Sequence, residues 1–537
     1  MPTLEWIGKR AVLNHHREVP YHLLKADPSL SVGEPGSGNL IVQGDNLLAL
    51  KALLPYYAGK VKCIYIDPPY NTGNENWTYN DAVNSPEMRA WLGKVVGREA
   101  EDLSRHDKWL CMMYPRLSLL RQFLSPDGVI FVSIDDNETG RLRLLMDEVF
   151  GPRAFVACNV WQKRYSRENR GSIGDAHEYV MAYAPNPDLF KQTVRKLPFS
   201  EKQAKVYKKS KGSASDRRWR AIPMTAQGYR PNQMYKITLP SGRVIEPPEG
   251  RCWSMIECEF QELRSVGRIY FGKKGDSQPG VIRFLDEVDG ITPWTWWNHE
   301  DFGHTDEAKK EIQRLFGTQT AFDTPKPLRL IQRILQIATG PDDLVLDSFG
   351  GSGTTGHAVL AQNKADGGRR NFILVEMDAQ ICRTVTSARL SKAVQGYECV
   401  SASKGKTTVD GLGGGFAFCS LGIAMFDEHG TIRSEVIFDE LARHIWFSET
   451  GTPMAKAKLN SSLVGIEGGT AYYLLFNGIL GDKRPNGGNV LTARTLEHLA
   501  AHNGPKVIFG EGCKLGASRL RREQITFKQI PYQLRTL

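Results

Sequence analysis

A glycine-rich turn between a short apolar strand and a helix most constrains how this chain can fold. The expected strand 344–349 begins with three aliphatic residues, a Gly-x-Gly-x-x-Gly pattern spans 351–356, and 355–362 has the apolar spacing of a helix. A second apolar run, 372–376, follows and ends in an acid. A strand, turn, helix and strand in this order predict a parallel sheet with helices on both faces.

The residues upstream of this unit repeat the alternation of helix and strand. Apolar residues recur at helical spacing in 45–54 and again in 109–124, and the run 61–67 is typical of a strand. Pro126-Asp127-Gly128 predicts a turn, and 129–134 reads as a further buried strand. The expected fold class is therefore α/β.

The three glycines also form a ligand-binding pattern. Gly351, Gly353 and Gly356 let the backbone turn tightly and approach a ligand, and Glu376 can accept hydrogen bonds from both hydroxyls of a ribose. The pattern therefore predicts a cofactor that contains adenosine. It does not distinguish a nicotinamide dinucleotide from S-adenosylmethionine, because both carry this nucleoside.

A second strand ends in a motif stiffened by proline. The apolar run 63–66 is followed by Asp67, Pro68, Pro69 and Tyr70. The prolines lack two backbone donors and hold the turn, so Asp67 and the Pro68 carbonyl can accept hydrogen bonds from an exocyclic amine while Tyr70 stacks on its ring. Such an amine is a poor nucleophile because its lone pair is delocalised into the ring. Two acceptors that favour a pyramidal nitrogen restore the lone pair for attack on a methyl group.

Basic residues are concentrated between these two motifs. The chain has 69 Lys and Arg against 59 Asp and Glu, a formal net charge of +10. Residues 161–230 contain sixteen Lys and Arg against six Asp and Glu, an excess equal to that of the whole chain, with seven Trp and Tyr interleaved. Cations for phosphates and flat rings for bases are typical of a nucleic-acid groove. The candidate DNA contacts are Lys163, Arg164, Arg167, Arg170, Lys208, Lys209, Lys211, Arg217, Arg218 and Arg220.

In this order the motifs resemble those of a known family. The Asp-Pro-Pro-Tyr motif, the basic insert and the Phe-Gly-Gly-Ser-Gly-Thr loop at 349–354 are similar to the β-class DNA amino-methyltransferases. In detail the chain looks like the adenine-N6 modification subunits of type III restriction systems, over about residues 38–400. The matching runs are 44–46, 62–73, 112–120, 133–136, 159–163, 177–184 and 322–327.

The resemblance implies a role for each matched position. Asp67, Pro68, Pro69 and Tyr70 would hold and activate the target adenine of duplex DNA after base flipping. S-adenosylmethionine would be the cofactor, and no metal would be needed. The protein would be a homodimer and would act with a separate helicase-nuclease restriction subunit. It would lie in the bacterial cytoplasm, at the nucleoid. The implied cofactor residues are Asp347, Phe349, Gly350, Gly351, Gly353 and Thr354 around the methionine part, Glu376 at the ribose, Asp45 and Asn46 at the adenine, and Thr324 and Lys326 at the carboxylate.

Composition shifts divide the chain into five expected segments. They are an N-terminal methyltransferase part (1–162), a basic target-recognition insert (163–320), a cofactor-binding part (321–403), a glycine-rich linker (404–415) and a small α/β domain for dimerisation or partner binding (416–537). The target-base strand precedes the cofactor strand, so the Rossmann-like fold is expected with permuted motif order and a mostly parallel sheet. We expect no membrane span, because no apolar run reaches about 18 residues, and no secretion signal.

Several alternatives remain open at this point. A cytosine-N4 methyltransferase uses the same geometry, although Asp before Pro-Pro-Tyr favours adenine. An NAD-dependent oxidoreductase fits the glycine loop but leaves the Asp67–Tyr70 motif unexplained, and a non-catalytic DNA-binding subunit explains only the charge. His177-Glu178 begins like a zinc-protease motif, but Met181 stands at the second histidine position, and the nine cysteines lack zinc-site spacing.

Overall fold

The computed structural model describes residues 4–33, 36–72, 93, 104–167, 173–199, 201–209, 217–317, 321–401, 405–454, 459, 461–476 and 488–531. The chain forms two compact units. The first comprises Met1–Arg195 and Trp294–Leu537, and the second comprises Lys196–Pro293. Among the described residues, no helix combines the length and apolar character needed to cross a bilayer.

The first unit is built on a ten-stranded sheet in the order β1-β20-β2-β17-β16-β3-β4-β6-β5-β15. Pairing is parallel from β20 through β4, and antiparallel where β1 joins β20 and where β6 joins β4 and β5. The expected mostly parallel sheet is confirmed. The strands are β1 (His22–Ala26), β20 (Ala417–Ala424), β2 (Leu40–Gln43), β17 (Asn371–Glu376), β16 (Leu344–Asp347), β3 (Val61–Ile66), β4 (Leu124–Ile134), β6 (His177–Tyr183), β5 (Phe155–Gln162) and β15 (Trp296–Trp297).

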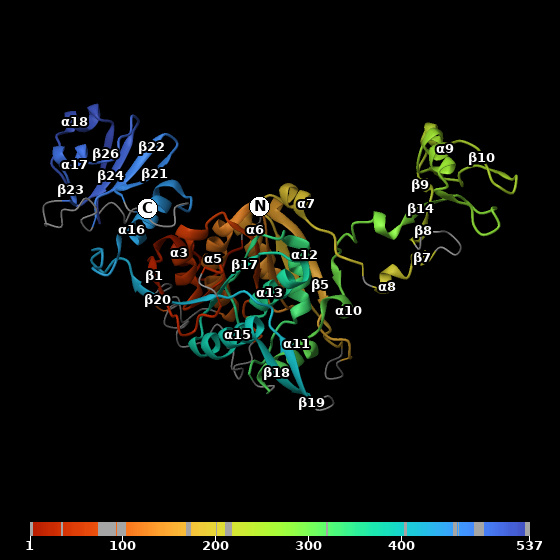
Figure 1. The fold of residues 1–537 in the computed structure, drawn as a ribbon, viewed down its shortest axis with the longest axis horizontal. Helices are drawn as coiled ribbons and strands as arrows, with labels where there is room; N and C mark the ends of the chain where they lie inside the picture. The colour runs from red at the N-terminus through yellow and green to blue at the C-terminus, as the bar shows by residue number, and fades with distance from the viewer. Residues whose placement is uncertain are drawn as a thin grey trace. The chain divides into compact units, whose positions relative to one another are not determined.

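Helices cover both faces of this sheet (Figure 1). On one face α3 (Asn46–Tyr57), α5 (Arg105–Phe123) and α6 (Thr139–Phe150) pack against a buried cluster that includes Ile64 and Ile373. On the other face α12 (Leu328–Ala338) contacts α13 (Thr354–Asp366), which contacts α15 (Ser387–Gln395). The predicted helices at 45–54, 109–124 and 355–362 are confirmed as α3, α5 and α13. The fold is therefore a three-layer α/β arrangement of the Rossmann-like type.

One predicted turn is instead part of a strand. The Pro126-Asp127-Gly128 segment lies inside β4, where the register against β3 shifts between the pairs Val61–Leu124 and Cys63–Val129. Lys62 holds the irregular segment, because its ammonium lies 2.8 Å from the Asp127 carbonyl oxygen and 2.6 Å from a carboxylate oxygen. Turn residues inside a strand are typical of a bulge, which explains the error.

The second unit is smaller than the expected insert. Residues 163–195 and 294–317 belong to the first unit, because β6 pairs with β4 and β15 pairs with β5. The second unit has a four-stranded sheet around a core that contains Trp253 and Phe260. Leu197 and Ile291, near its two ends, exchange backbone hydrogen bonds of 2.8 Å. Its main elements are β7 (Lys208–Lys209), β8 (Arg218–Pro223), β9 (Thr225–Gln227), β10 (Ile237–Thr238), β11 (Val244–Ile245), β12 (Arg251–Trp253), α9 (Glu257–Ser265), β13 (Ile269–Tyr270) and β14 (Gly280–Phe284).

The structure also differs from the expected linker at 404–415. Residues 405–410 form β19, which pairs with β18 (Gly396–Ser401) as a hairpin, and the amides of Leu412 and Gly413 bond to carbonyl groups at the end of α15. β20 then returns to the main sheet. The more C-terminal residues form the expected small α/β structure, with α16 (Phe438–Thr450) and a sheet of β21 (Leu463–Glu467), β22 (Thr470–Leu474), β24 (Lys506–Gly510) and β26 (Ile525–Gln529).

Candidate active site

The two sequence motifs meet at the carboxyl ends of neighbouring strands. β3 delivers Asp67 and β16 delivers Asp347, and the strands pair in parallel with Ile64 opposite Leu346. Every residue of β3 is buried, because helices cover both faces of the sheet. Ligands of open α/β sheets bind at this edge, so strand packing alone places the two motifs side by side.

Both motifs line one cavity of about 420 Å³. Pro68 and Pro69 lie on its wall with Asp67 and Tyr70. Trp109 donates a 2.6 Å hydrogen bond to the Pro69 carbonyl and so fixes the proline turn. The other candidate residues on the wall are Thr324, Lys326, Asp347, Phe349, Gly350, Gly351 and Thr354, together with Lys163 and Arg164.

Asp67 is at the centre of a polar cluster. Its Oδ1 accepts a 2.9 Å hydrogen bond from the Tyr70 hydroxyl, and its Oδ2 pairs with the Lys326 ammonium at 2.5 Å. The same ammonium lies 5.0 Å from the centre of the Tyr70 ring. Burial raises the pKa of Asp67, against the opposing effect of the Lys326 charge. Lys326 therefore neutralises a carboxylate that the enclosed cavity would otherwise destabilise.

The glycine turn is held by hydrogen bonds that order its backbone. Gly353 has φ of 76°, a left-handed conformation that glycine adopts without strain, and ends the turn before α13. The Asp347 carboxylate accepts hydrogen bonds from the Phe349 amide at 3.0 Å and the Thr355 hydroxyl at 2.6 Å. Burial raises the pKa of Asp347 to about 7 despite these bonds. The wall of the cavity thus contains an acid that titrates near neutrality.

Glu376 lies behind the turn. Its two carboxylate oxygens accept hydrogen bonds from the Gly351 amide at 2.7 Å and the Asp378 amide at 2.8 Å. Glu376 and Gly353 are not among the residues of the described chain that line the cavity. The structure therefore shows Glu376 as a support of the turn.

Asp45 and Asn46 lie at the start of α3, beside the same turn. Asp45 accepts hydrogen bonds from the amides of Leu47 and Leu48, as helix-capping residues do. Asn46 donates to the Ser348 carbonyl at 3.2 Å, and buried Arg116 bonds to both side chains. These residues brace the turn and, within the described chain, are not on the cavity wall.

The ten predicted DNA contacts divide into three groups. Lys163 is buried in ion pairs with Asp175 at 2.7 Å and Glu178 at 3.3 Å, so it belongs to the cavity rather than to an outer surface. Arg164 and Arg167 are exposed on the first unit, and Arg218 and Arg220 are exposed on the second, where Arg217 pairs with Asp286 at 2.8 Å. Arg170 and Lys211 lie outside the described residues, as do the side chains of Lys208 and Lys209.

Glu178 is a site residue that the sequence interpretation missed. It lies on β6, lines the cavity, and its carboxylate is 3.1 Å from the Tyr70 hydroxyl. His177-Glu178 resembles only the start of a zinc motif, and Met181 stands where the second histidine would be. One signal in the sequence could have identified Glu178. It is an acidic residue between β-forming residues, in a strand that leads to the cavity.

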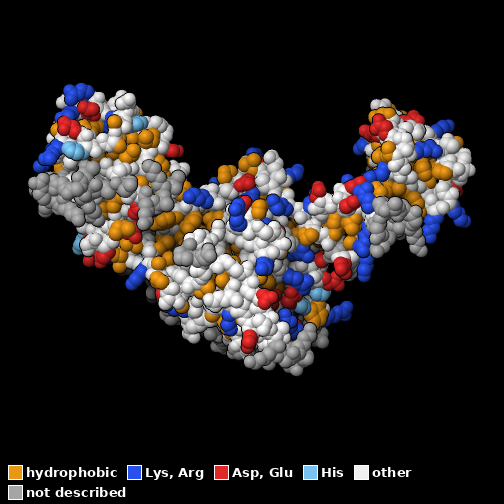
Figure 2. All heavy atoms as spheres, viewed as in Figure 1, with side chains coloured by type: hydrophobic (Ala, Val, Ile, Leu, Met, Phe, Trp, Pro, Cys, Tyr) orange, Lys and Arg blue, Asp and Glu red, His pale blue; other side chains and the backbone are white. Residues whose placement is uncertain are grey.

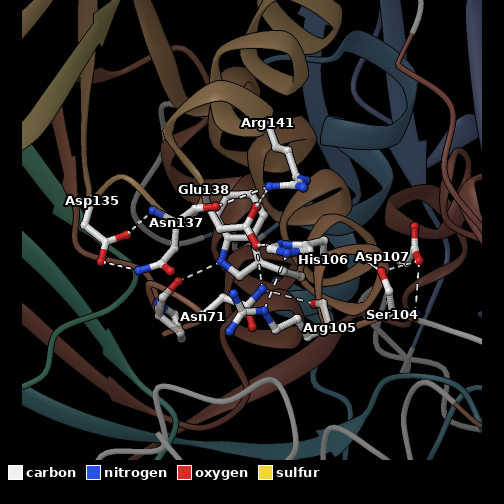
Figure 3. A network of polar contacts seen from close by, with 11 residues as sticks. Asn71, Ser104, Arg105, His106, Asp107, Asp135, Asn137, Glu138 and Arg141 are labelled. Carbon is white, nitrogen blue, oxygen red and sulfur yellow. Dashed lines mark hydrogen bonds and ion pairs between the residues drawn. The ribbon is translucent and has the colours of Figure 1, made fainter. Parts of the chain in front are cut away.

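A second polar network surrounds Asn71, the residue next to Tyr70 (Figure 3). Asn71 has φ of 59°, unusual for a residue with a side chain. Its amide donates to the Arg105 carbonyl at 3.2 Å and to the fully buried Glu138 at 2.5 Å. His106 also contacts Glu138 at 2.5 Å, and Arg141 lies 3.6 Å from it. These contacts hold the strained residue that follows the motif.

The fold and this cavity together define a class of protein, the Rossmann-like methyltransferases, with a glycine turn and an acidic proline motif on adjacent strands. Within that class the chain belongs to the DNA methylase family, whose sequence model matches residues 61–387. It is similar to the type III restriction-modification enzyme StyLTI Mod subunit of Salmonella typhimurium, with 38% identity over 64% of this chain and 53% of that one.

Other relatives match a comparable part of the chain. The EcoPI Mod subunit of Escherichia phage P1 is 33% identical over 71% of this chain and 64% of its own. The type II methyltransferase M.KpnI of Klebsiella pneumoniae is 31% identical over 64% of this chain and 81% of its own. The chain thus spans between about half and two thirds of the length of these Mod subunits, but most of M.KpnI.

Proposed function

We propose that the protein transfers a methyl group from S-adenosylmethionine to the N6 amine of adenine in duplex DNA. The observation that carries this proposal is the meeting of the Asp67–Tyr70 motif and the glycine turn on one cavity. An oxidoreductase needs the turn but not the motif, and a non-catalytic DNA-binding subunit needs neither. Cytosine-N4 transfer remains the second candidate, because the same acceptors suit its amine.

The cavity fits the proposed cofactor by charge and by shape. S-adenosylmethionine carries a sulfonium and an ammonium, and Asp347 offers a buried carboxylate on the wall. The turn passes close to the Phe322 ring, since a Cβ at Gly351 would lie 3.2 Å from it. Asp347, Phe349, Gly350, Gly351 and Thr354 would hold the cofactor, with Glu376, Asp45 and Asn46 supporting them. Bound there, it supplies an electrophilic methyl group.

The proline motif would hold and activate the target amine. Asp67 accepts two hydrogen bonds in the structure, from a phenol and an ammonium, so it presents lone pairs of the kind that an exocyclic amine needs. The adenine must leave the base stack to reach a cavity of this kind. Asp67 and the Pro68 carbonyl would then accept from N6, and Tyr70 would stack on the ring. Catalysis would come mainly from positioning.

The second unit provides a surface suited to DNA. It contains eighteen Lys and Arg against eleven Asp and Glu, and Figure 2 shows blue side chains at several places on its surface. Exposed Arg220 on β8 lies directly opposite exposed Arg283 on β14, and Arg218 shares their face. Like charges opposite one another destabilise a sheet. The Arg220–Arg283 pair therefore favours a surface that binds phosphates. Arg164 and Arg167 of the first unit would add further phosphate contacts.

We further propose the setting that the Mod subunits suggest. The chain would act in a restriction-modification system, as a homodimer with a separate restriction subunit, in the cytoplasm near the nucleoid. The small α/β structure that follows β20 is the candidate for assembly contacts. Deleting residues 425–537 and measuring molar mass by light scattering tests this, and an unchanged oligomer would contradict it.

The central proposal is tested by methyl transfer from labelled S-adenosylmethionine to unmodified DNA. The wild-type protein should place label in N6-methyladenine after nucleoside digestion, and Asp67→Ala should lower the rate by about a hundredfold or more. Label in N4-methylcytosine would favour the second candidate. Undiminished transfer by the variant would contradict the role of Asp67, and calorimetry with NAD in place of the cofactor tests the oxidoreductase alternative.

A further inference from the structure

Glu178 is the least expected charge in the cavity. Its carboxylate contacts three groups: the Tyr70 hydroxyl at 3.1 Å, Lys163 at 3.3 Å and Lys326 at 4.0 Å. Its side chain is only 11% exposed. A buried acid is costly unless it is paired, and this one lies opposite Asp67 across the Tyr70 hydroxyl. The cavity thus contains two carboxylates that share one phenol and one ammonium.

Lys326 occupies the place that a substrate amine would take. Its ammonium is 2.5 Å from Asp67 Oδ2, which is an acceptor needed for the target amine. An amine that approaches the lone pair used by Lys326 would displace the ammonium from this oxygen, so Lys326 would move when the base enters from this side. Among the described residues, Glu178 offers a second carboxylate, 4.0 Å from the ammonium. A second carboxylate beside the ammonium would offset the cost of moving a buried charge away from Asp67.

We propose that Glu178 is a positioning residue of the target-base pocket, which orients Tyr70 and receives the Lys326 ammonium when the substrate amine replaces it on Asp67. The inference rests on the proposed function, because it requires an amine that enters the cavity. Lys163, paired with Glu178 and Asp175, keeps Glu178 in place. The Glu178 and Asp175 charges hold the pKa of Lys163 above its usual value despite burial, so Lys163 stays protonated at neutral pH.

The test is a double-mutant cycle on Glu178→Gln and Lys326→Met, measured as single-turnover methyl transfer to duplex DNA. Glu178→Gln keeps the shape and one acceptor oxygen but removes the negative charge that would pair with the ammonium, so its rate should fall about tenfold or more. DNA affinity, measured by fluorescence anisotropy, should change less than about twofold. In the Lys326→Met background the competing ammonium is absent, and Glu178→Gln should then cost about twofold at most.

A matched control is Glu449→Gln, which removes a carboxylate outside the cavity. The Glu449 side chain is 9% exposed, and its carboxylate lies 2.6 Å from the Lys528 ammonium. This variant should transfer methyl groups at the wild-type rate. If Glu178→Gln does not fold, as judged by its thermal melt, Glu178→Asp takes its place in the cycle. The shorter acid should lose part of the rate, and the loss should again shrink in the Lys326→Met background.

Two outcomes overturn the inference while leaving the proposed function intact. One is a wild-type rate in Glu178→Gln, and the other is an equal loss in both Lys326 backgrounds, which would show that the residues act independently. A wild-type protein that transfers no methyl group to DNA contradicts the proposed function itself, and the inference fails with it.

Discussion

Asp347 is one of the cavity residues whose charge depends on pH. Its side chain is 3% exposed and its pKa is raised by burial to about 7. Because the pKa of this acid is higher in the folded state, its contribution to stability is present below its ordinary pKa of 3.8 and is lost as the pH rises to about 7. A cationic ligand beside Asp347 favours the ionised carboxylate, because it binds this form more tightly than the protonated acid.

We therefore expect the affinity for S-adenosylmethionine to rise with pH up to about 7 and then level off, at the pKa of Asp347. Below that value, binding must expel a proton from the carboxyl group. Calorimetry in two buffers of different ionisation enthalpy measures this release, and Asp347→Asn should abolish it. An equal proton release in the variant would contradict the assignment.

A second residue-scale prediction concerns Glu138. Glu138→Ala leaves the Asn71 amide without its buried acceptor, so the free energy of unfolding should fall by about 2–4 kcal/mol. Methyl transfer should also fall, because Asn71 follows Tyr70. Urea denaturation measures the first effect. Glu428→Ala, at a side chain that is 88% exposed, is the control and should leave the midpoint unchanged; a similar midpoint for both variants would contradict the prediction.

At the scale of elements, the packing of α13 on the sheet depends on Gly356. A Cβ there would lie 3.0 Å from Leu390 on α15 and 3.1 Å from Leu374 on β17. Gly356→Val should lower the free energy of unfolding by about 1–3 kcal/mol through overpacking. Gly140→Ala in α6, where a Cβ would meet no atom within 4 Å, should be neutral or slightly stabilising. Thermal melts of both variants test the contrast.

The elements that the sequence predicts well are those whose apolar pattern is strong. The strands β3, β16 and β17 are buried, and their continuous apolar runs show it. Patterns governed by distant partners were missed. Lys62 contacts the bulge in β4 from the neighbouring strand, and residues 405–410 of the predicted linker form a strand that pairs with β18.

The same division holds within the site. The meeting of Asp67 and Asp347 follows from strand order and was predictable from the two motifs. The contacts of Lys326 with Asp67 and of Glu178 with Tyr70 join residues 259 and 108 positions apart in the chain. No local pattern encodes such a contact, so only the folded sheet reveals it.

At the scale of the whole molecule, the second unit is an insertion whose ends are neighbours. Leu197 and Ile291 bond to each other through their backbones, so the residues between them can be replaced by a short Gly-Ser linker. We expect the remaining protein to fold and to bind S-adenosylmethionine, because the cavity is lined by residues of the first unit. DNA binding should weaken and lose its steep salt dependence.

Circular dichroism, calorimetry and anisotropy at two salt concentrations test this deletion. Retained DNA affinity would show that the phosphate contacts lie on the first unit. A matched variant, Arg220→Ala with Arg283→Ala, should weaken DNA binding without affecting the fold, because both side chains are exposed. Unchanged affinity in this variant would remove the paired arginines from the proposed surface.

Adjoining ends also matter for how such a protein changes over evolutionary time. A segment whose two ends are joined by a backbone bridge can be lost, gained or exchanged by recombination as a single cassette, since the path of the flanking backbone is preserved. The cavity would then be inherited unchanged while the exchanged cassette alters which DNA is approached. One chemistry can in this way acquire many target sequences, without any substitution among the residues that line the cavity.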